Sequence, residues 1–205
     1  MILVDIGNTH YHILEDNQIY DLKEIKKFND KIYYISVNNK KEQKLLELNP
    51  SAINLKNFVN FKTSYKNLGI DRILACIPVK NGVVVDAGSA VTIDIMQDGI
   101  HKGGIIMPGI FAFKEAFVKI SKVLNMDIKK FDLNKLPQNT NEALLYGSVG
   151  SILKMIKSFN SPYYFTGGDG KFLSSFVDGI YIKDLVFRGM EKTIKEKNDN
   201  SFTKR

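Results

Sequence analysis

The sequence of 205 residues contains one cysteine, no tryptophan and no apolar run close to the roughly 20 residues of a membrane-spanning helix. The single cysteine, Cys76, excludes an intramolecular disulfide framework and suits a reducing compartment. Met1 leads directly into a strand-like segment, without the charged and apolar regions of a signal peptide. These absences predict a soluble, cytoplasmic protein with no membrane partner.

Two common nucleotide-binding signatures are also missing from the sequence. It has no Walker lysine motif and no G-x-G-x-x-G, so a nucleotide-binding protein of either class is excluded. Its three histidines, His10, His12 and His101, show no convincing metal-ligand spacing. His10 and His12 would share one strand face, but we do not favour a two-histidine metal site. Cys76 is interpreted as a small core residue rather than a nucleophile.

The formal net charge of +7 has two interpretations. It could attract anions such as a nucleotide, an acidic metabolite or nucleic acid. It could equally reflect lysines scattered over solvated faces. We favour the second interpretation, because the lysines form no dense block and no aromatic-interleaved nucleic-acid motif is present. A nucleic-acid partner is therefore not expected.

One strand pattern occurs twice in the sequence. Residues 2–7, 11–14 and 18–22 read as three antiparallel strands, with a glycine turn after the first and Asp16-Asn17 before the third. Residues 82–88, 91–96 and 100–107 repeat this order, with Asp98-Gly99 before the third strand. A gapless alignment of the two copies matches Asp5 with Asp86 and Gly7 with Gly88. The repeat indicates an internal duplication.

The remaining segments alternate between strand and helix patterns. Residues 31–37 and 163–166 predict strands, and residues 39–48 predict a short charged helix. Apolar residues at helical spacing follow Gly109, and another helix is expected near Asn139, with Glu142 as a capping-box partner. The apolar stripe of that helix is predicted to be core and comprises Leu145, Val149, Ile152 and Ile156.

The two Asp-x-Gly turns carry the first candidate chemistry. A carboxylate at the end of a buried strand is costly unless it meets a cation, a hydrogen-bond donor or a polar cleft. The glycine lets backbone N–H groups approach an anion. Asn8, Thr9 and Ser89 add side-chain donors. One such motif alone would be read as a plain turn. Its duplication favours a pair of phosphate-binding turns, each with an aspartate near a metal.

Two further segments are weaker signals when taken alone. Thr166-Gly167-Gly168 ends a strand and could pass under adenine or ribose, although an ordinary strand-to-helix connection is nearly as good an interpretation. Asp71 and Arg72 precede an apolar helix predicted over residues 73–77 and could be a surface or capping pair. In the functional interpretation, Asp71 accepts the proton of a substrate hydroxyl and Arg72 binds a substrate carboxylate.

Six blocks together resemble the type III pantothenate kinases, a family of the actin, hexokinase and Hsp70 superfamily. The blocks are DIGNT (5–9), Tyr65 followed by GIDR (69–72), DAGSAVTID (86–94), GGIIMPG (103–109), NTNEALLYG (139–147) and TGGDG (166–170). The resemblance implies an α/β fold, the duplicated actin-like (ribonuclease H-like) ATPase fold, with two lobes that each hold a mixed β-sheet flanked by helices. We expect the lobes to be residues 1–78 and 79–205.

The resemblance also implies ATP-dependent phosphorylation of pantothenate, the first step of coenzyme A synthesis. Asp71 would be the catalytic base and Asp5 would lie near Mg²⁺. Asp86 would bind a monovalent cation, K⁺ or NH₄⁺, and Ser89 stands where the family usually has threonine. Pantothenate would be bound by Tyr65, Gly69, Ile70, Asp71, Arg72 and Thr140. ATP would be bound by Asp5, Ile6, Gly7, Asn8, Thr9, His10, Tyr11, His12, Gly88, Ser89, Thr166, Gly167 and Gly168. A homodimer is implied, with the helix of Thr140 near its interface.

Two alternatives stay open. The chain could be another small-molecule kinase on the same fold, although the Tyr65 and GIDR block is specific to pantothenate. It could also be a non-catalytic transcriptional accessory protein of the same family. The joint presence of Asp5, Asp71, Arg72 and Asp86 argues against that second alternative.

Overall fold

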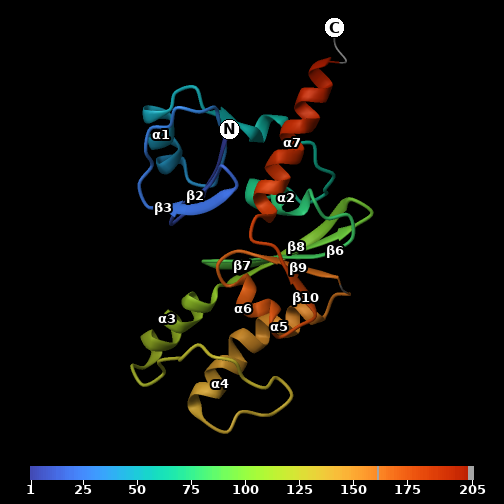
Figure 1. The fold of residues 1–205 in the computed structure, drawn as a ribbon. Coiled ribbons are helices and arrows are strands. Elements are labelled where there is room, and N and C mark those ends of the chain that lie inside the picture. Colours follow the sequence, from blue (N-terminus) through green and yellow to red (C-terminus); the bar gives the residue numbers. More distant parts are fainter. Residues whose placement is uncertain (161, 203–205) are drawn as a thin grey trace. The chain divides into compact units, whose positions relative to one another are not determined.

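The duplicated strand pattern folds into two mixed five-stranded sheets in the computed structural model, which describes residues 1–160 and 162–202 (Figure 1). Contacts divide the chain into two units. The first unit contains residues 1–80, 99–101 and 184–205, and the second contains residues 81–98 and 102–183. The sequence placed the boundary at residues 78 and 79 and all later residues in the second lobe. The unit division differs because the C-terminal helix packs against a helix of the first unit.

The sheet of the first unit has the strand order β3-β2-β1-β4-β5. Its strands are β1 (Ile2–Ile6), β2 (Tyr11–Glu15), β3 (Gln18–Leu22), β4 (Ile32–Ser36) and β5 (Ile53–Asn54). β1 and β3 run antiparallel to β2, whereas β1, β4 and β5 run parallel to one another. The three predicted antiparallel strands and the strand predicted over 31–37 are therefore confirmed.

Three α-helices and a 3₁₀ turn complete the first unit. They are α1 (Asn39–Leu48), η1 (Leu55–Phe58), α2 (Ile70–Cys76) and α7 (Leu185–Phe202). α1 has the predicted bounds and is capped by Asn38, whose side chain accepts a hydrogen bond from the Lys41 N–H. Tyr34 of β4 donates to Glu42 of α1 over 2.8 Å, which ties this helix to the sheet. α2 and α7 lie side by side (Figure 1).

The sheet of the second unit has the order β10-β9-β6-β7-β8. Its strands are β6 (Gly82–Ala87), β7 (Ala90–Gln97), β8 (Ile100–Pro108), β9 (Tyr163–Thr166) and β10 (Gly179–Tyr181). Its helices are α3 (Ile110–Ile120), α4 (Thr140–Gly147), α5 (Val149–Lys157) and α6 (Gly170–Ser174). The order matches that of the first sheet strand for strand, with β6 in the place of β1 and β9 in the place of β4. The predicted α/β fold, with two mixed sheets of matching strand order and flanking helices, is confirmed.

The gapless alignment of the two copies is wrong in detail. Residues 7–10 join the paired Ile6 and Tyr11, whereas only residues 88–90 join Ala87 and Val91. β7 is longer than β2, so the turn after it lies one residue later than the gapless alignment places it. Both later turns use left-handed residues, Asp16-Asn17 and Asp98-Gly99, as two-residue hairpins require.

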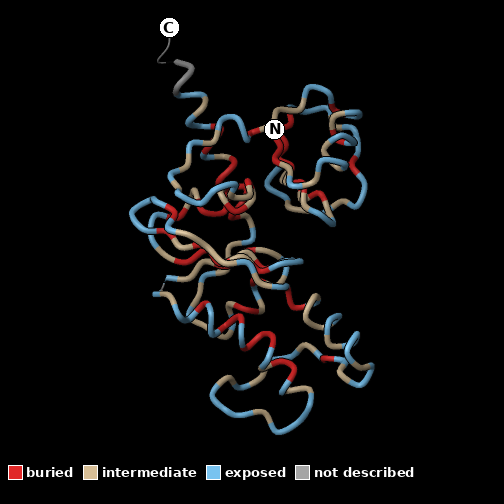
Figure 2. Tube along the Cα trace, turned by 180° about the vertical axis from the view of Figure 1, so that it is seen from behind, coloured by how far each residue is buried: buried red, intermediate tan, exposed pale blue. Residues whose placement is uncertain are grey.

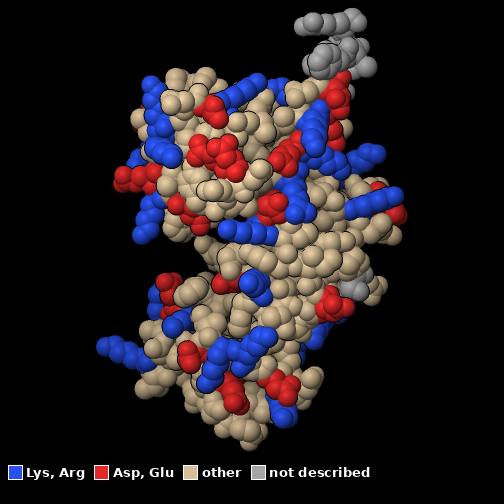
Figure 3. Space-filling model, viewed as in Figure 1, with Lys and Arg blue, Asp and Glu red and all other residues tan. Residues whose placement is uncertain are grey.

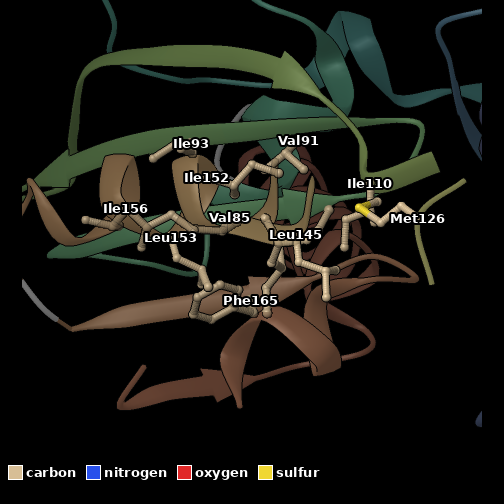
Figure 4. Close-up of a cluster of buried hydrophobic side chains, with 14 of the residues drawn as sticks. Val85, Val91, Ile93, Ile110, Met126, Leu145, Ile152, Leu153, Ile156 and Phe165 are labelled. Carbon is tan, nitrogen blue, oxygen red and sulfur yellow. The ribbon is translucent and has the colours of Figure 1, made fainter. Parts of the chain in front are cut away.

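The core of the second unit lies between its sheet and the α4–α5 pair (Figure 4). Val85, Ile93 and Phe165 of the strands belong to the same buried cluster as the apolar stripe of the helices. Figure 2 shows buried residues in the strands and in these helices. The predicted stripe is fully buried and comprises Leu145, Val149, Ile152 and Ile156. The stripe belongs to two helices rather than one, because the helix is interrupted at Ser148. The Ser148 hydroxyl donates to the Leu144 carbonyl over 2.6 Å.

No helix in the described part of the chain is both long and apolar enough to cross a membrane.

Candidate functional site

The first Asp-x-Gly turn lies at the end of β1. Asp5 is half-buried and is paired across the sheet with His12 of β2 and Ile35 of β4. The Gly7 N–H donates to the His10 carbonyl over 3.1 Å, which closes a four-residue loop. Asn8 and Thr9 at its tip are exposed. The loop therefore presents a hydroxyl, an amide and backbone groups beside a carboxylate.

In the predicted phosphate-binding segment of residues 5–12, some side chains are exposed at the loop and others are buried in the core. Ile6 and Tyr11 are buried, and the Tyr11 hydroxyl donates to the Lys41 carbonyl over 3.0 Å. Only the backbone groups of these two residues are placed to meet a ligand. His12 points to the other face of β2 and forms a 2.6 Å hydrogen bond between its Nδ1 and Asp21 Oδ1. That bond fixes the imidazole beside the loop.

The second Asp-x-Gly turn is tighter than the first. The Gly88 N–H donates to the Ala90 carbonyl over 2.9 Å, and Ser89 is exposed at the tip of the turn. The Ser89 carbonyl accepts a hydrogen bond from the Gly109 N–H over 3.1 Å. A Cβ at Gly109 would lie 2.2 Å from the Gly88 carbonyl oxygen. The glycine of the GGIIMPG block is therefore required where α3 begins, because it packs directly on this turn.

The predicted third turn meets the second turn within the same sheet. Thr166 of β9 is paired with Asp86 of β6, and Gly167 follows at a left-handed φ of 81°. A Cβ at Gly167 would lie 2.5 Å from Asp86 Oδ1. The structure thus brings together Asp86, Thr166 and Gly167, as a shared nucleotide or cation site requires.

Two residues of this region were not predicted as site residues. The Tyr181 hydroxyl donates to the Gly167 carbonyl over 3.4 Å, and burial, followed by the negative charge of Asp86, raises the pKa of Tyr181. Burial also raises the pKa of the Asp169 carboxyl, whose N–H donates to the Ala87 carbonyl over 2.9 Å. Asp169 could have been found from its place in the TGGDG block. Tyr181 carries no sequence signal, because its partner is 14 residues away.

The GIDR block opens α2. The predicted helix start at residue 73 is wrong: α2 begins at Ile70, so that Asp71 and Arg72 lie in its first turn. The Gly69 carbonyl accepts the Ile73 N–H over 3.0 Å, and Asp71 Oδ1 accepts the Arg72 N–H over 2.9 Å. A carboxylate at a helix N-terminus is favourable. A Cβ at Gly69 would lie 2.5 Å from Asp71 Oδ1, so a larger residue there would require the Asp71 carboxylate to shift.

Tyr65 and Arg72 contact each other, as a common substrate site would need. The Arg72 guanidinium carbon lies 5.1 Å from the centroid of the Tyr65 ring, within the range of a cation–π contact. Arg72 is 5% exposed and Tyr65 is 37% exposed. The aromatic ring therefore covers part of a largely buried cation and remains accessible itself.

Thr140 is the first residue of α4 and is exposed. The Asn139 side chain caps this helix by accepting the Glu142 N–H over 2.9 Å, and Glu142 in turn accepts the Gln138 N–H over 3.2 Å. The hydrogen bond from Gln138, and then that of Asn139, lower the pKa of Glu142. The predicted helix start is confirmed, whereas the predicted capping box is only partly formed, because Glu142 accepts the N–H of Gln138 rather than that of the cap residue Asn139.

The predicted site residues fall into both units. Those of residues 5–12 and 65–72 belong to the first unit, and Asp86, Gly88, Ser89, Thr140 and residues 166–168 belong to the second. Among the described side chains, no group of three or more His, Cys, Asp or Glu is placed to hold a metal ion. Asp5 and Asp86 are single half-buried carboxylates. A single carboxylate such as Asp5 fits Mg²⁺, which binds through one or two carboxylates and otherwise uses substrate phosphates and water.

Comparisons with known proteins give a consistent result. A family model described as "Type III pantothenate kinase" matches residues 36–161. The type III pantothenate kinase of Helicobacter hepaticus is 45% identical over 204 residues, covering 96% of this chain and 99% of that protein. That of Campylobacter jejuni subsp. jejuni is 45% identical over 205 residues, covering 96% and 97%. A crystal structure from Campylobacter jejuni, described as a conserved Baf family transcriptional activator, is 43% identical with a TM-score of 0.88, covering 97% of this chain and 100% of that one.

Proposed function

The chain belongs to the type III pantothenate kinase family, and we propose that it transfers the γ-phosphoryl group of ATP to the primary hydroxyl of pantothenate, the first step of coenzyme A synthesis. The observation that carries this proposal is the first turn of α2. It places a carboxylate and a guanidinium in adjacent positions, with the guanidinium against the Tyr65 ring. A hydroxy acid such as pantothenate needs these two groups, one for each end.

Asp71 is the proposed base. Its Oδ1 is held by the Arg72 N–H, and in the described part of the chain its other oxygen makes no hydrogen bond. That second carboxylate oxygen can accept the proton of the pantothenate hydroxyl. The hydroxyl oxygen then attacks the γ-phosphorus of ATP as the bond from this phosphorus to ADP breaks. Arg72 would bind the pantothenate carboxylate, and Tyr65 would hold the guanidinium plane in place.

The two Asp-x-Gly turns are the proposed phosphate sites. Their backbone N–H groups and the hydroxyls of Thr9 and Ser89 would donate to phosphate oxygens. Mg²⁺ would be held by Asp5 and the phosphates, and would neutralise the charge that develops on the transferred group. A monovalent cation, K⁺ or NH₄⁺, would be held by Asp86. Gly167 supports this assignment because it lets backbone approach Asp86 without a side chain between them.

We propose that the protein is a homodimer. The second unit exposes several large apolar residues around α3 and the segment that follows α3. They are Ile106, Phe111, Ile120, Val123 and Leu136, which are 59%, 62%, 74%, 82% and 76% exposed. Exposed apolar residues of this kind mark interaction surfaces when they form a patch. Association of two copies would remove them from water, and Thr140 lies on the helix after this segment.

We also propose a cytoplasmic location. The sequence contains one cysteine, the buried Cys76, and so cannot form a disulfide within the chain, as expected of a protein that folds in a reducing compartment.

The second candidate function is that of a transcriptional accessory protein, which the description of the Campylobacter jejuni structure suggests. On the face drawn in Figure 3, Lys and Arg side chains are interspersed with Asp and Glu. A protein that binds DNA through phosphate contacts would show a steep loss of DNA retention with salt. We expect weak retention with a shallow salt dependence. Steep dependence together with an inactive enzyme would favour the accessory function.

The first test measures phosphopantothenate formed from ATP and pantothenate with Mg²⁺, with and without K⁺ or NH₄⁺. We expect product that depends on the monovalent cation. Asp71→Asn should lower turnover by about 10²–10⁴-fold, the usual contribution of a general base, with ATP binding retained. Asp178→Asn is the matched control, because Asp178 is exposed and lies outside the proposed site. An equal loss of ATP affinity in Asp71→Asn would contradict the proposed role.

A further inference from the structure

His101 is a buried histidine to which the sequence assigned no role. It is 1% exposed and lies at the start of β8. It contacts the segment that precedes α2: its N–H donates to the Lys62 carbonyl over 3.0 Å, and it forms an isolated parallel bridge with Thr63. Its Nδ1 lies 2.8 Å from Thr63 Oγ1. Both the backbone and the side chain of His101 therefore hold this segment.

The same hydrogen-bond network reaches Tyr65. The Tyr65 N–H donates to Thr63 Oγ1 over 3.0 Å, so this hydroxyl can give its own proton to His101 Nδ1. The His101 ring also packs against Tyr65, with centroids 6.1 Å apart, and against Phe61 at 5.8 Å. The Tyr65 ring then meets Arg72 at 5.1 Å.

This support matters because the Tyr65 segment has little regular structure. Residues 59–69 contain no helix or strand apart from the bridge to His101. Asn67 within this segment is in the left-handed region, with a φ of 59°. A side chain on such a segment loses conformational freedom when it binds a ligand, unless other contacts already restrain it.

We propose that His101 is a positioning residue for pantothenate. Through the Thr63 hydroxyl and its own ring it fixes Tyr65, which in turn holds the guanidinium of Arg72 where the pantothenate carboxylate binds. This proposal rests on the proposed function. His101 touches neither the reacting hydroxyl nor the phosphoryl group in this assignment, so its effect is on substrate binding rather than on the chemical step.

The test compares Thr63→Val, which removes the hydroxyl at nearly constant shape, with Thr63→Ser, which keeps it. We expect Thr63→Val to raise the KM and the calorimetric Kd for pantothenate about 10-fold, close to the effect of losing one or two hydrogen bonds, with kcat and the KM for ATP within about twofold of the wild type. Thr63→Ser should resemble the wild type. His101→Asn keeps a polar atom near the Nδ1 position and should be milder than His101→Phe.

A double-variant cycle completes the test. If the two side chains act through one hydrogen bond, adding Thr63→Val to His101→Phe should have almost no further effect on pantothenate binding. Unchanged pantothenate binding in folded Thr63→Val, or an equal loss of ATP binding, would overturn the positioning role. Wild-type activity separates the two proposals: an inactive wild type overturns the proposed function, whereas an active wild type with unaltered variants overturns only the role of His101.

Discussion

Gly189 in α7 is the position where one added methyl group should disturb the proposed substrate site most clearly. A Cβ at Gly189 would lie 2.0 Å from the Leu74 carbonyl oxygen and 2.7 Å from the carbonyl carbon. These are backbone atoms of α2, so no side-chain rotation relieves the overlap. Real contacts of this kind are not closer than 3.0 Å, so Gly189→Ala requires α2 and α7 to separate locally by about 1 Å.

The cost of this separation follows from the packing around it. α2 and α7 pack against each other, and both contribute buried apolar side chains, among them Leu74, Phe187 and Met190. Packing would be lost if the helices moved apart. Overpacking costs about 1–3 kcal/mol, and a backbone overlap belongs at the upper end of that range. Alanine is more favourable than glycine in a helix interior by about 1 kcal/mol, which offsets part of this cost. The free energy of unfolding should therefore fall by about 2 kcal/mol, or roughly 4–8 °C in Tm for a chain of this size.

Thermal unfolding followed by circular dichroism measures this effect, and Gly147→Ala provides the matched control. Gly147 ends α4, and a Cβ there meets no atom within 4 Å. Gly147→Ala should leave Tm unchanged or raise it slightly. Gly189→Ala should also lose kinase activity, because α2 carries Asp71. A Gly189→Ala protein as stable as the wild type, with Gly147→Ala behaving as expected, would refute the packing argument.

Three further predictions concern the second unit. Gly167→Ala combines a left-handed φ with a Cβ 2.5 Å from Asp86 Oδ1, so it should destabilise the protein by about 3 kcal/mol in denaturant titration and abolish the cation dependence of activity. Burial raises the pKa of the Asp169 carboxyl above its ordinary value of 3.8, so this group stabilises the fold at pH values below 3.8, and that stabilisation is lost as the pH rises through the folded-state pKa. Asp169→Asn should therefore have a higher Tm than the wild type at pH 7 but not at pH 3. Phe111→Glu should convert the proposed dimer to monomer in light scattering, and a dimer that survives would exclude α3 from the interface.

Local patterns explain why most of the fold could be predicted. Each strand of the duplicated motif is an apolar run bounded by turn residues, and Asn38 caps α1 through a contact three residues away. These signals lie within a few residues of each other, so the sequence alone carries them. The start of α2 was missed because Gly69 and Asp71 resemble a loop in sequence, whereas the Gly69 carbonyl already accepts the first helical hydrogen bond.

Contacts between distant residues explain what was missed at the candidate site. His101 meets Thr63 across 38 residues, and Gly189 meets Leu74 from the other end of the chain. Neither the histidine nor the glycine shows a local pattern that indicates its partner. Ser148 shows the limit of periodicity in another way: the apolar stripe continues across it, but its hydroxyl bonds to the Leu144 carbonyl and the helix is interrupted there.

The duplicated turns are alike in topology but not in chemistry, and this difference bears on their proposed roles. The first loop has four residues and keeps a histidine beside Asp5, with His12 fixed by Asp21. The second has three residues, and Asp86 is flanked by Thr92, Thr166 and the backbone of Gly167. A longer loop with side-chain donors suits phosphate oxygens that move during transfer. A carboxylate paired in the sheet with two threonines and close to a glycine backbone suits a cation that stays in place. We therefore propose Mg²⁺ with the phosphates at Asp5 and the monovalent cation at Asp86.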